Sequence, residues 1–273
     1  MKFGFFKCSK KFIQQTRAWN VRSHLLNLGC GAHFHPAWMN VDAVPASLDV
    51  MPHDLCDPLP FADGSFSAVY HSHVLEHFPR AFAPVFLAEC HRMLKIGGIL
   101  RVAVPDLEKI ACLYLETLRE ALSGNEQADL RHEWMTIELL DQMTREETGG
   151  EMLKFWSHRP MPAKEFVIQR TGQEVLRFIQ TLEQQIPAPQ APSKPAKPSA
   201  VEVAQFRESG EIHKWMYDRF SLARILRSAG FAGCKLCAAD ESSIPDFNSY
   251  RLDVCENGSA RKPDSIFMEA VKP

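Results

Sequence analysis

Short apolar runs alternate with segments of helical periodicity through the first third of the chain, and this alternation constrains the fold more than any other feature. The runs are Leu25–Leu28, Trp38–Val41, Phe66–Tyr70 and Ile99–Val104. A run of about four to eight apolar residues between turn signals is typical of a buried strand. The segment 79–94 repeats its apolar residues at helical spacing. Strands interleaved with helices predict an α/β fold with a parallel sheet covered on both faces.

The pattern after Pro105 is mostly helical, and it becomes strand-like again near the end. We expect helices over 106–123, 126–147 and 163–185, with breaks at Gly149-Gly150 and Pro160-Met161-Pro162. The stretch 187–198 carries five prolines. Proline fixes φ and lacks the backbone N–H, so this stretch is predicted to be a solvated linker. A helix over 221–230 follows, with Ser221 as its N-cap, and then two strands near 233–238 and 265–271.

This order divides the chain into four parts. They are an N-terminal basic and aromatic segment (1–24), the first part of the α/β core (25–105), a helical insertion containing the linker (106–218), and the completion of the core (219–273). We expect the insertion to set substrate choice, because proteins of one fold differ mainly in the sites grafted on it.

Composition excludes some classes of function. Lys+Arg number 31 against 33 Asp+Glu, a net charge of −2, whereas a dedicated nucleic-acid-binding protein normally has a basic excess. No run of eighteen apolar residues occurs, so we expect no transmembrane helix. Lysines interrupt the apolar start before it reaches the length of a signal peptide. The eight scattered cysteines are typical of reduced thiols and predict a cytoplasmic protein. Peripheral membrane contact through the Phe-rich N-terminus is a weaker hypothesis.

The first strand runs directly into a glycine turn, Gly29-Cys30-Gly31. Glycines at such a turn let the backbone bend sharply and approach a ligand closely. A nicotinamide-binding unit is disfavoured, because the third glycine is absent and the next acidic residue, Asp42, comes too early. A carboxylate at the end of the second run can accept hydrogen bonds from both hydroxyls of a ribose. The alternative for Asp42 is a solvated turn residue.

Four ordered motifs strengthen the nucleotide interpretation. They are LNLGCG at Leu26–Gly31, DLxxxLPFxDxSF at Asp54–Phe66, SHVLEHF at Ser72–Phe78 and ExxRMLKxGG at Glu89–Gly98. In this order they closely resemble the class I S-adenosylmethionine-dependent methyltransferases, specifically the methyltransferase type 11 group. The resemblance covers roughly residues 25–105 and, more loosely, the helix over 221–230 and the final strands.

The resemblance implies a Rossmann-like sheet of seven strands, the last antiparallel, that binds S-adenosyl-L-methionine. It also implies positions around the cofactor. The glycine turn would pass beneath the methionine and ribose, Asp42 would hold the ribose hydroxyls, Asp54 and Leu55 would lie beside the adenine, and Ser72 and His73 would face the sulfonium. The turn residues in question are Gly29, Cys30 and Gly31.

Two features of the chain depart from the family pattern. Asn27 stands where related chains often have an acidic residue, which weakens the expected contact to the amino group of the cofactor. The connection 32–37 is too short for a parallel crossover of about a dozen residues. The first crossover helix must therefore be missing or very short.

Methyl transfer needs a general base only when the acceptor carries a proton. Candidates near the expected acceptor site are His73, Glu76 and His77 after the fourth strand and Asp106 after the fifth. Histidine is suited because it titrates near neutral pH. For Glu76 and His77 the alternative is a structural role at the start of a helix.

A second group of candidates lies late in the insertion, in the segment His213-Lys214-Trp215-Met216-Tyr217. It resembles an HxWMYD segment of bacterial members of the family, several of which accompany saccharide-modifying enzymes. His213 and Tyr217 would then contact a polar, glycan-like acceptor. Core packing by Trp215 and Met216 is the alternative.

The histidines at 71, 73 and 77 lack a cysteine or carboxylate at zinc spacing, so no metal site is expected. The sequence thus supports an active methyltransferase that modifies an oxygen or nitrogen of a small-molecule or glycan-like acceptor. The rival hypothesis is a catalytically inactive module of the same fold that serves as a binding or regulatory partner.

Overall fold

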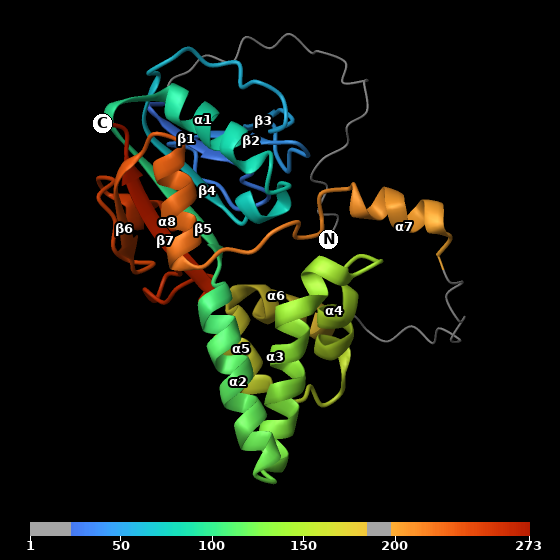
Figure 1. Ribbon diagram of the computed structural model, residues 1–273. Helices are drawn as coiled ribbons and strands as arrows, with labels where there is room; N and C mark the ends of the chain where they lie inside the picture. The colour runs from blue at the N-terminus through green and yellow to red at the C-terminus, as the bar shows by residue number, and fades with distance from the viewer. Residues whose placement is uncertain (1–22, 185–197) are drawn as a thin grey trace.

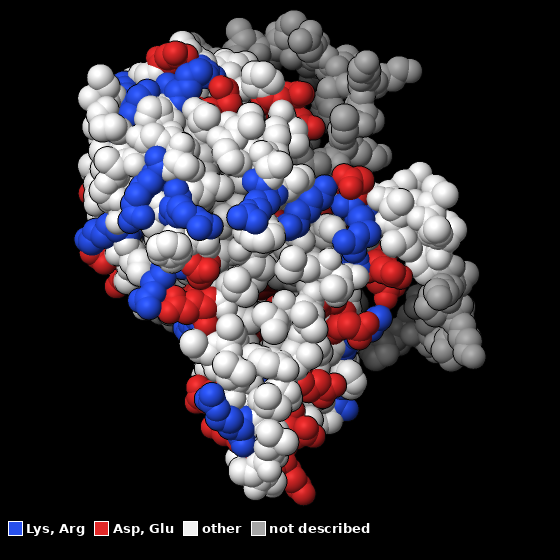
Figure 2. Space-filling model, in the orientation of Figure 1, with Lys and Arg blue, Asp and Glu red and all other residues white. Residues whose placement is uncertain are grey.

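A computed structural model describes residues 23–184 and 198–273 (Figure 1). The expected N-terminal segment, apart from its last two residues, and the proline-rich linker, apart from Pro198, lie outside the described residues. The hypothesis of membrane contact through the N-terminus lies there too. Among the described helices, none is long and apolar enough to cross a membrane. On the face seen in Figure 2, acidic and basic side chains are interspersed, with basic ones gathered in a band across the middle.

The core is a seven-stranded sheet in the order β3-β2-β1-β4-β5-β7-β6. Its strands are β1 (Leu25–Leu28), β2 (Met39–Asp42), β3 (Val50–Pro52), β4 (Phe66–Ser72), β5 (Leu94–Pro105), β6 (Ala232–Cys237) and β7 (Ser265–Val271). Strand β7 pairs antiparallel with both of its neighbours, and all other pairs are parallel. The predicted fold class, a Rossmann-like sheet with an antiparallel last strand, is confirmed.

Eight α-helices occur in the described residues. They are α1 (Ala83–Met93), α2 (Leu107–Leu122), α3 (Glu126–Thr144), α4 (Gly150–Ser157), α5 (Lys164–Thr171), α6 (Gln173–Gln184), α7 (Ala200–Arg207) and α8 (Arg219–Ser228), with short 3₁₀ helices η1 (Leu75–His77) and η2 (Phe247–Tyr250). Helices α1 and α8 cover one face of the sheet (Figure 1). On this face Leu26, Val69 and Leu100 belong to one buried cluster with Phe86 and Leu226.

Among residues 23–184 and 198–273, no α-helix covers the opposite face. No helix connects β1 to β2, in agreement with the short connection seen in the sequence. The segment 238–264, between β6 and β7, folds over this face instead. Its side chains Phe247 and Leu252 pack on Trp38 and Tyr70, with the rings of Trp38 and Phe247 edge to face at 6.1 Å. A late segment of the chain thus replaces the missing crossover helix.

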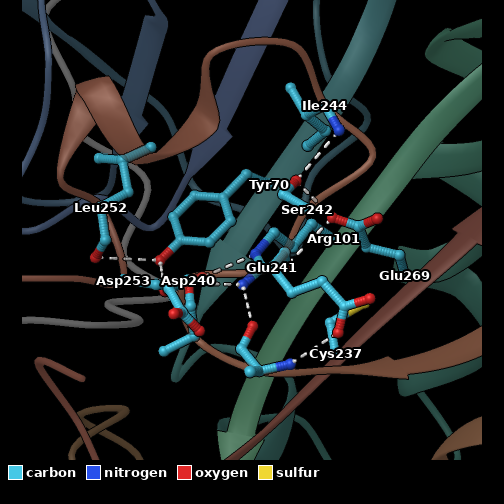
Figure 3. A network of polar contacts seen from close by, with 12 residues as sticks. Tyr70, Arg101, Cys237, Asp240, Glu241, Ser242, Ile244, Leu252, Asp253 and Glu269 are labelled. Atoms are coloured by element: carbon cyan, nitrogen blue, oxygen red, sulfur yellow. Dashed lines mark hydrogen bonds and ion pairs between the residues drawn. The ribbon is translucent and has the colours of Figure 1, made fainter. Parts of the chain in front are cut away.

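A buried polar network fastens this segment to the sheet (Figure 3). Arg101 on β5 is fully buried, and its guanidinium donates to Asp253 at 2.7 Å and to Glu269 at 3.0 Å. The remaining guanidinium N–H groups donate to carbonyls of residues 238, 239 and 241, and the Tyr70 hydroxyl donates to Asp253 at 2.6 Å. Every charge in this network has a partner of opposite sign, as burial of charges requires.

The insertion forms a second core beside the end of β5 (Figure 1). Trp134, Trp156 and Val167 lie at its centre, and the buried Arg170 and Glu138 form an ion pair within it. Helices α2 to α6 pack mainly on one another rather than on the sheet. The insertion is therefore a compact helical unit attached to the carboxyl edge of the sheet.

Several predicted boundaries were wrong, each for a local reason. The helix expected over 163–185 breaks at Gly172, whose φ is 57° and where an added Cβ would lie 2.6 Å from Pro263. The helix expected over 126–147 ends earlier, at Thr144, and a further helix, α4, begins at Gly150. Helix α8 begins two residues earlier than expected, since Asp218 rather than Ser221 is its N-cap. Strand β3 was missed because it is only three residues long.

Candidate functional site

The glycine turn at the end of β1 has a backbone conformation that favours glycine. Gly29 and Gly31 have φ of 64° and 55°, values in the left-handed region that other residues adopt at a cost. A Cβ added at Gly31 would meet nothing within 4 Å, so the turn faces open space. The Gly31 N–H donates to the Asp42 carboxylate at 2.7 Å. The turn and the end of β2 are therefore held together before any ligand binds.

Asp42 is only 2% exposed. One carboxylate oxygen accepts from Gly31 and the other accepts from the Val44 N–H at 2.9 Å. Burial raises the pKa of Asp42, while the two backbone N–H donors oppose that rise. A carboxylate has about four acceptor positions, so about two remain. Asp42 therefore organises the turn and retains acceptor capacity.

The other predicted cofactor residues differ in what they contact. The Asn27 side chain is buried and donates to Asn40 at 3.0 Å, so it is engaged inside the sheet. Asp54 accepts from the Cys56 N–H at 2.9 Å and shapes the loop after β3. Leu55 is buried next to it. Burial raises the pKa of the Cys30 thiol to about 12, and this cysteine stays protonated. Ser72 ends β4.

A polar cluster follows β4 directly. His73 has a positive φ of 54°, and its Nε2 lies 2.7 Å from the Ser265 hydroxyl at the start of β7. Its Nδ1 lies 3.5 Å from a carboxyl oxygen of Glu76. Glu76 is fully buried in η1, and neither of its oxygens makes a hydrogen bond within the described part of the chain.

The late segment of the insertion completes this cluster. The rings of His77 and His213 meet edge to face at 4.9 Å, and Nδ1 of His77 lies 3.1 Å from the Ile212 carbonyl. The Tyr217 hydroxyl is buried nearby. Burial, and to a smaller extent the Glu76 carboxyl, raise the pKa of this hydroxyl. We call Glu76, His73, His77, His213 and Tyr217 the histidine cluster.

Backbone hydrogen bonds clamp the two halves of the histidine cluster together. The N–H groups of Lys214 and Trp215 both donate to the Glu76 carbonyl, at 2.7 and 3.1 Å. The His213 N–H donates to the Gln142 carbonyl in α3 at 2.8 Å. These bonds fix the late insertion segment to η1 and to the helical unit, so the side chains of the cluster are held in place.

Burial dominates the electrostatics of the histidine cluster. It raises the pKa of Glu76 to about 8 and lowers the pKa of His77 to about 4. The pKa values of His73 and His213 fall well below the ordinary value for the same reason. Burial raises the pKa of Tyr217. At neutral pH the three imidazoles are therefore uncharged, and the phenol keeps its proton.

The structure brings together all four residues predicted as catalytic, His73, His77, His213 and Tyr217, although their roles stay predictions. His71 points into the core, where its ring meets Phe86 at 5.2 Å. The backbone of Asp106 pairs with that of Tyr217, and the Asp106 carboxylate caps helix α2.

Sequence analysis missed two neighbours of the histidine cluster. They are Ser265, which contacts His73, and Lys262, whose pKa burial and Arg261 lower to about 8. Both stand at the start of β7, and the antiparallel direction of that strand brings its start to the carboxyl edge of the sheet. The expected antiparallel direction of the last strand was the signal from which these two neighbours could have been predicted.

The fold and the site can now be compared with known proteins. Residues 26–102 match the family described as "Methyltransferase domain", and these residues contain the glycine turn, Asp42 and η1. Over these residues the chain resembles a class I S-adenosylmethionine-dependent methyltransferase domain. The order of its sheet, with β7 antiparallel between β5 and β6, is the order expected for this fold.

Three similar solved structures are each distant from the chain in sequence. A methyltransferase from Archaeoglobus fulgidus is 13% identical, with 92% of this chain and 86% of that chain covered and a TM-score of 0.38. One from Thermotoga maritima is 10% identical, with 91% and 82% covered and a TM-score of 0.39. One from Haloferax volcanii, in complex with the Trm112 methyltransferase activator, is 14% identical, with 92% and 82% covered and a TM-score of 0.38. No curated protein matches the chain.

The residues of this methyltransferase domain fit S-adenosylmethionine, the cofactor of its family. The open space at Gly31 admits a ligand against the backbone of the turn. The remaining acceptor positions of Asp42 suit the two hydroxyls of a ribose. Asn27 is the exception, because its amide is already paired with Asn40.

Proposed function

We propose that this methyltransferase transfers a methyl group to an oxygen or nitrogen of a polar small-molecule or glycan-like acceptor. One observation carries the proposal. Both carboxyl oxygens of Glu76, Nδ1 of His213 and the Tyr217 hydroxyl are buried without a hydrogen-bond partner among the described residues. Leaving one such group unpaired costs about 1–3 kcal/mol, and native proteins seldom retain them unless water or a ligand satisfies them. A polar acceptor supplies the missing partners.

The chemistry divides between the cofactor and the chain. S-adenosylmethionine, when bound, supplies a methyl group that the positive sulfonium already activates. The chain therefore has to orient the acceptor and exclude water, and the buried histidine cluster suits both tasks. His73 is the proposed general base, because its imidazole is uncharged at neutral pH and Ser265 fixes its ring. Tyr217 keeps its proton and would donate a hydrogen bond to the acceptor.

A cavity supports a polar acceptor. It has a volume of about 500 Å³ and lies between α6 and the segment that covers the second face of the sheet. Its lining includes His33, Gln173, Arg177, Arg251, Asn257 and Arg261. His33 follows the glycine turn closely, so the cavity lies next to the cofactor residues. Guanidinium and amide donors suit an acceptor rich in hydroxyl or carboxylate oxygens.

Methyl-group tracing tests the proposed function. The protein would be incubated with methyl-tritiated S-adenosylmethionine and a polar small-molecule and glycan extract of cells that contain it. We expect label in one polar product, and we expect His73→Ala to lower the rate by about 10²- to 10⁴-fold, the range for loss of a general base. His158→Ala is the control, because His158 is exposed and lies outside the cluster.

Two results would overturn the proposal. Cofactor binding without transfer to any fraction would favour the rival hypothesis of an inactive binding or regulatory module. Full activity of His73→Ala would remove His73 from the mechanism.

A further inference from the structure

Three side chains of metal-ligand type meet inside the histidine cluster. Glu76, His77 and His213 each offer a ligand atom, and these atoms lie within 4.8 Å of one another. Two imidazoles and one carboxylate are the protein ligands of several catalytic zinc sites and of non-haem iron sites, which keep further positions open for water or substrate. The sequence argument against a metal considered only spacing along the chain, and it did not foresee that His213 approaches η1 from the end of the insertion.

The candidate ligand atoms are buried and lack hydrogen-bond partners, as atoms that bind a cation would. Both oxygens of Glu76 and Nδ1 of His213 are buried without a hydrogen-bond partner in the described part of the chain, and the two residues are 0% and 3% exposed.

The surroundings of the three residues are those of a preorganised site. Nδ1 of His77 lies 3.1 Å from the Ile212 carbonyl, and a contact of this kind typically orients a ligating imidazole and fixes its tautomer. The Glu76 backbone accepts two hydrogen bonds from the segment that follows His213. The ligands are therefore held near one another by the fold, which lowers the cost of binding an ion.

We propose that Glu76, His77 and His213 bind a divalent transition-metal ion of the zinc class. His73 and Tyr217 flank this site, so an ion there would have an acceptor oxygen within reach and would lower the pKa of an acceptor hydroxyl. This role in catalysis rests on the proposed function. The binding of the ion does not, because it needs neither the cofactor nor an acceptor.

Cobalt titration of the full-length, chelator-treated protein tests the site. Co²⁺ would be added while the visible d–d absorption bands are recorded, and Zn²⁺ would then be added as a competitor. We expect one bound Co²⁺ per chain, no sulfur-to-cobalt charge-transfer band, and displacement by Zn²⁺. Glu76→Gln and His213→Ala should each weaken binding at least tenfold, which is within the effect expected for loss of a ligand. His158→Ala should bind as the unchanged protein does, since this histidine is exposed and outside the site.

The outcomes separate this inference from the proposed function. Absence of a d–d spectrum, or equal Co²⁺ affinity in all three variants, would overturn the metal site. A sulfur-to-cobalt band would also overturn it, because it would place the ion on cysteines such as the exposed Cys56 and Cys112. Glu76→Gln keeps the size of the side chain, and its far-ultraviolet circular dichroism would show that loss of binding is not loss of fold. None of these readouts depends on cofactor binding or turnover.

Discussion

The Arg101 network and the histidine cluster are both buried and polar, and they differ in one respect. In the network, the guanidinium and the two carboxylates have partners of opposite charge at 2.7 and 3.0 Å. In the histidine cluster, the Glu76 carboxyl is equally buried and its oxygens have no hydrogen-bond donor among the described residues. The first arrangement stabilises the fold, because it attaches the segment 238–264 to the sheet. The second costs stability, which indicates that it is kept for a ligand.

The largest expected effect tests the network. Asp253→Ala leaves Arg101 with an unpaired buried charge and removes the acceptor of the Tyr70 hydroxyl. We expect the free energy of unfolding to fall by about 3–5 kcal/mol, the range for breaking one partner of a buried ion pair. Urea denaturation would measure it, with the exposed Asp240→Ala as the control. A loss no larger than that of the control would show that the network does not fasten the covering segment.

An intermediate effect of opposite sign tests the histidine cluster. Glu76→Met replaces an unpaired buried carboxyl with an apolar side chain of similar size. In the metal-free protein we expect the free energy of unfolding to rise by about 1–3 kcal/mol, the cost of leaving such a group unpaired. Denaturation by urea, with the fold checked by circular dichroism, would measure the change.

Glu138→Met is the matched control for that experiment. Glu138 is also a buried carboxylate, but it accepts hydrogen bonds from Trp134 and Arg170. We expect this variant to be destabilised, because Arg170 loses its partner. If both variants change stability in the same direction, the distinction between paired and unpaired carboxyls fails.

The smallest expected effect concerns a helix cap outside the core. It tests whether paired polar groups stabilise the folded protein there as well. Asp218 is only partly buried, and its carboxylate accepts from the N–H groups of Phe220 and Ser221 at the start of α8. Asp218→Ala should lower the free energy of unfolding by about 0.5–2 kcal/mol, as loss of an N-cap does. Asp218→Asn keeps a capping oxygen and should lose less.

The pH dependence of the Asp218→Ala effect has a definite sign. The backbone N–H of Ser221 lowers the pKa of Asp218 in the folded protein. A carboxylate with a lowered folded pKa contributes stability above its unfolded pKa, and the contribution is lost as the pH falls through the folded value. The difference between unchanged protein and Asp218→Ala should therefore be larger at pH 7 than in strong acid. An equal difference at both pH values would contradict this role of the charge.

The two halves of the site differed in how well they could be predicted from the sequence. Gly29, Gly31 and Asp42 lie close together in the chain, and local turn chemistry and motif order were enough to place them. Ser265 and Lys262 reach the histidine cluster only through the direction of β7, and no local pattern marks them. The proposed cofactor half is encoded locally, whereas the proposed acceptor half depends on tertiary contacts.

The fold shows the same division. Strands β1, β2 and β4 have clear apolar runs with turn signals and could be predicted. Arg101 lies inside such a run, so its buried partners could not be inferred from periodicity. The covering role of the segment 238–264 could not be foreseen either, because its aromatic residues follow no regular spacing. Its packing on Trp38 and Tyr70 is decided by the whole sheet.

Calorimetric titration with S-adenosylmethionine tests the central claim most directly, namely that the glycine turn and Asp42 form a working cofactor site. The account predicts that the unchanged protein binds the cofactor and its demethylated product, and that Asp42→Ala weakens binding by about 1.5–3 kcal/mol, the contribution of hydrogen bonds to a charged group. The exposed Asp49→Ala should bind normally. No binding of either compound, or equal affinity of Asp42→Ala and the unchanged protein, would contradict it.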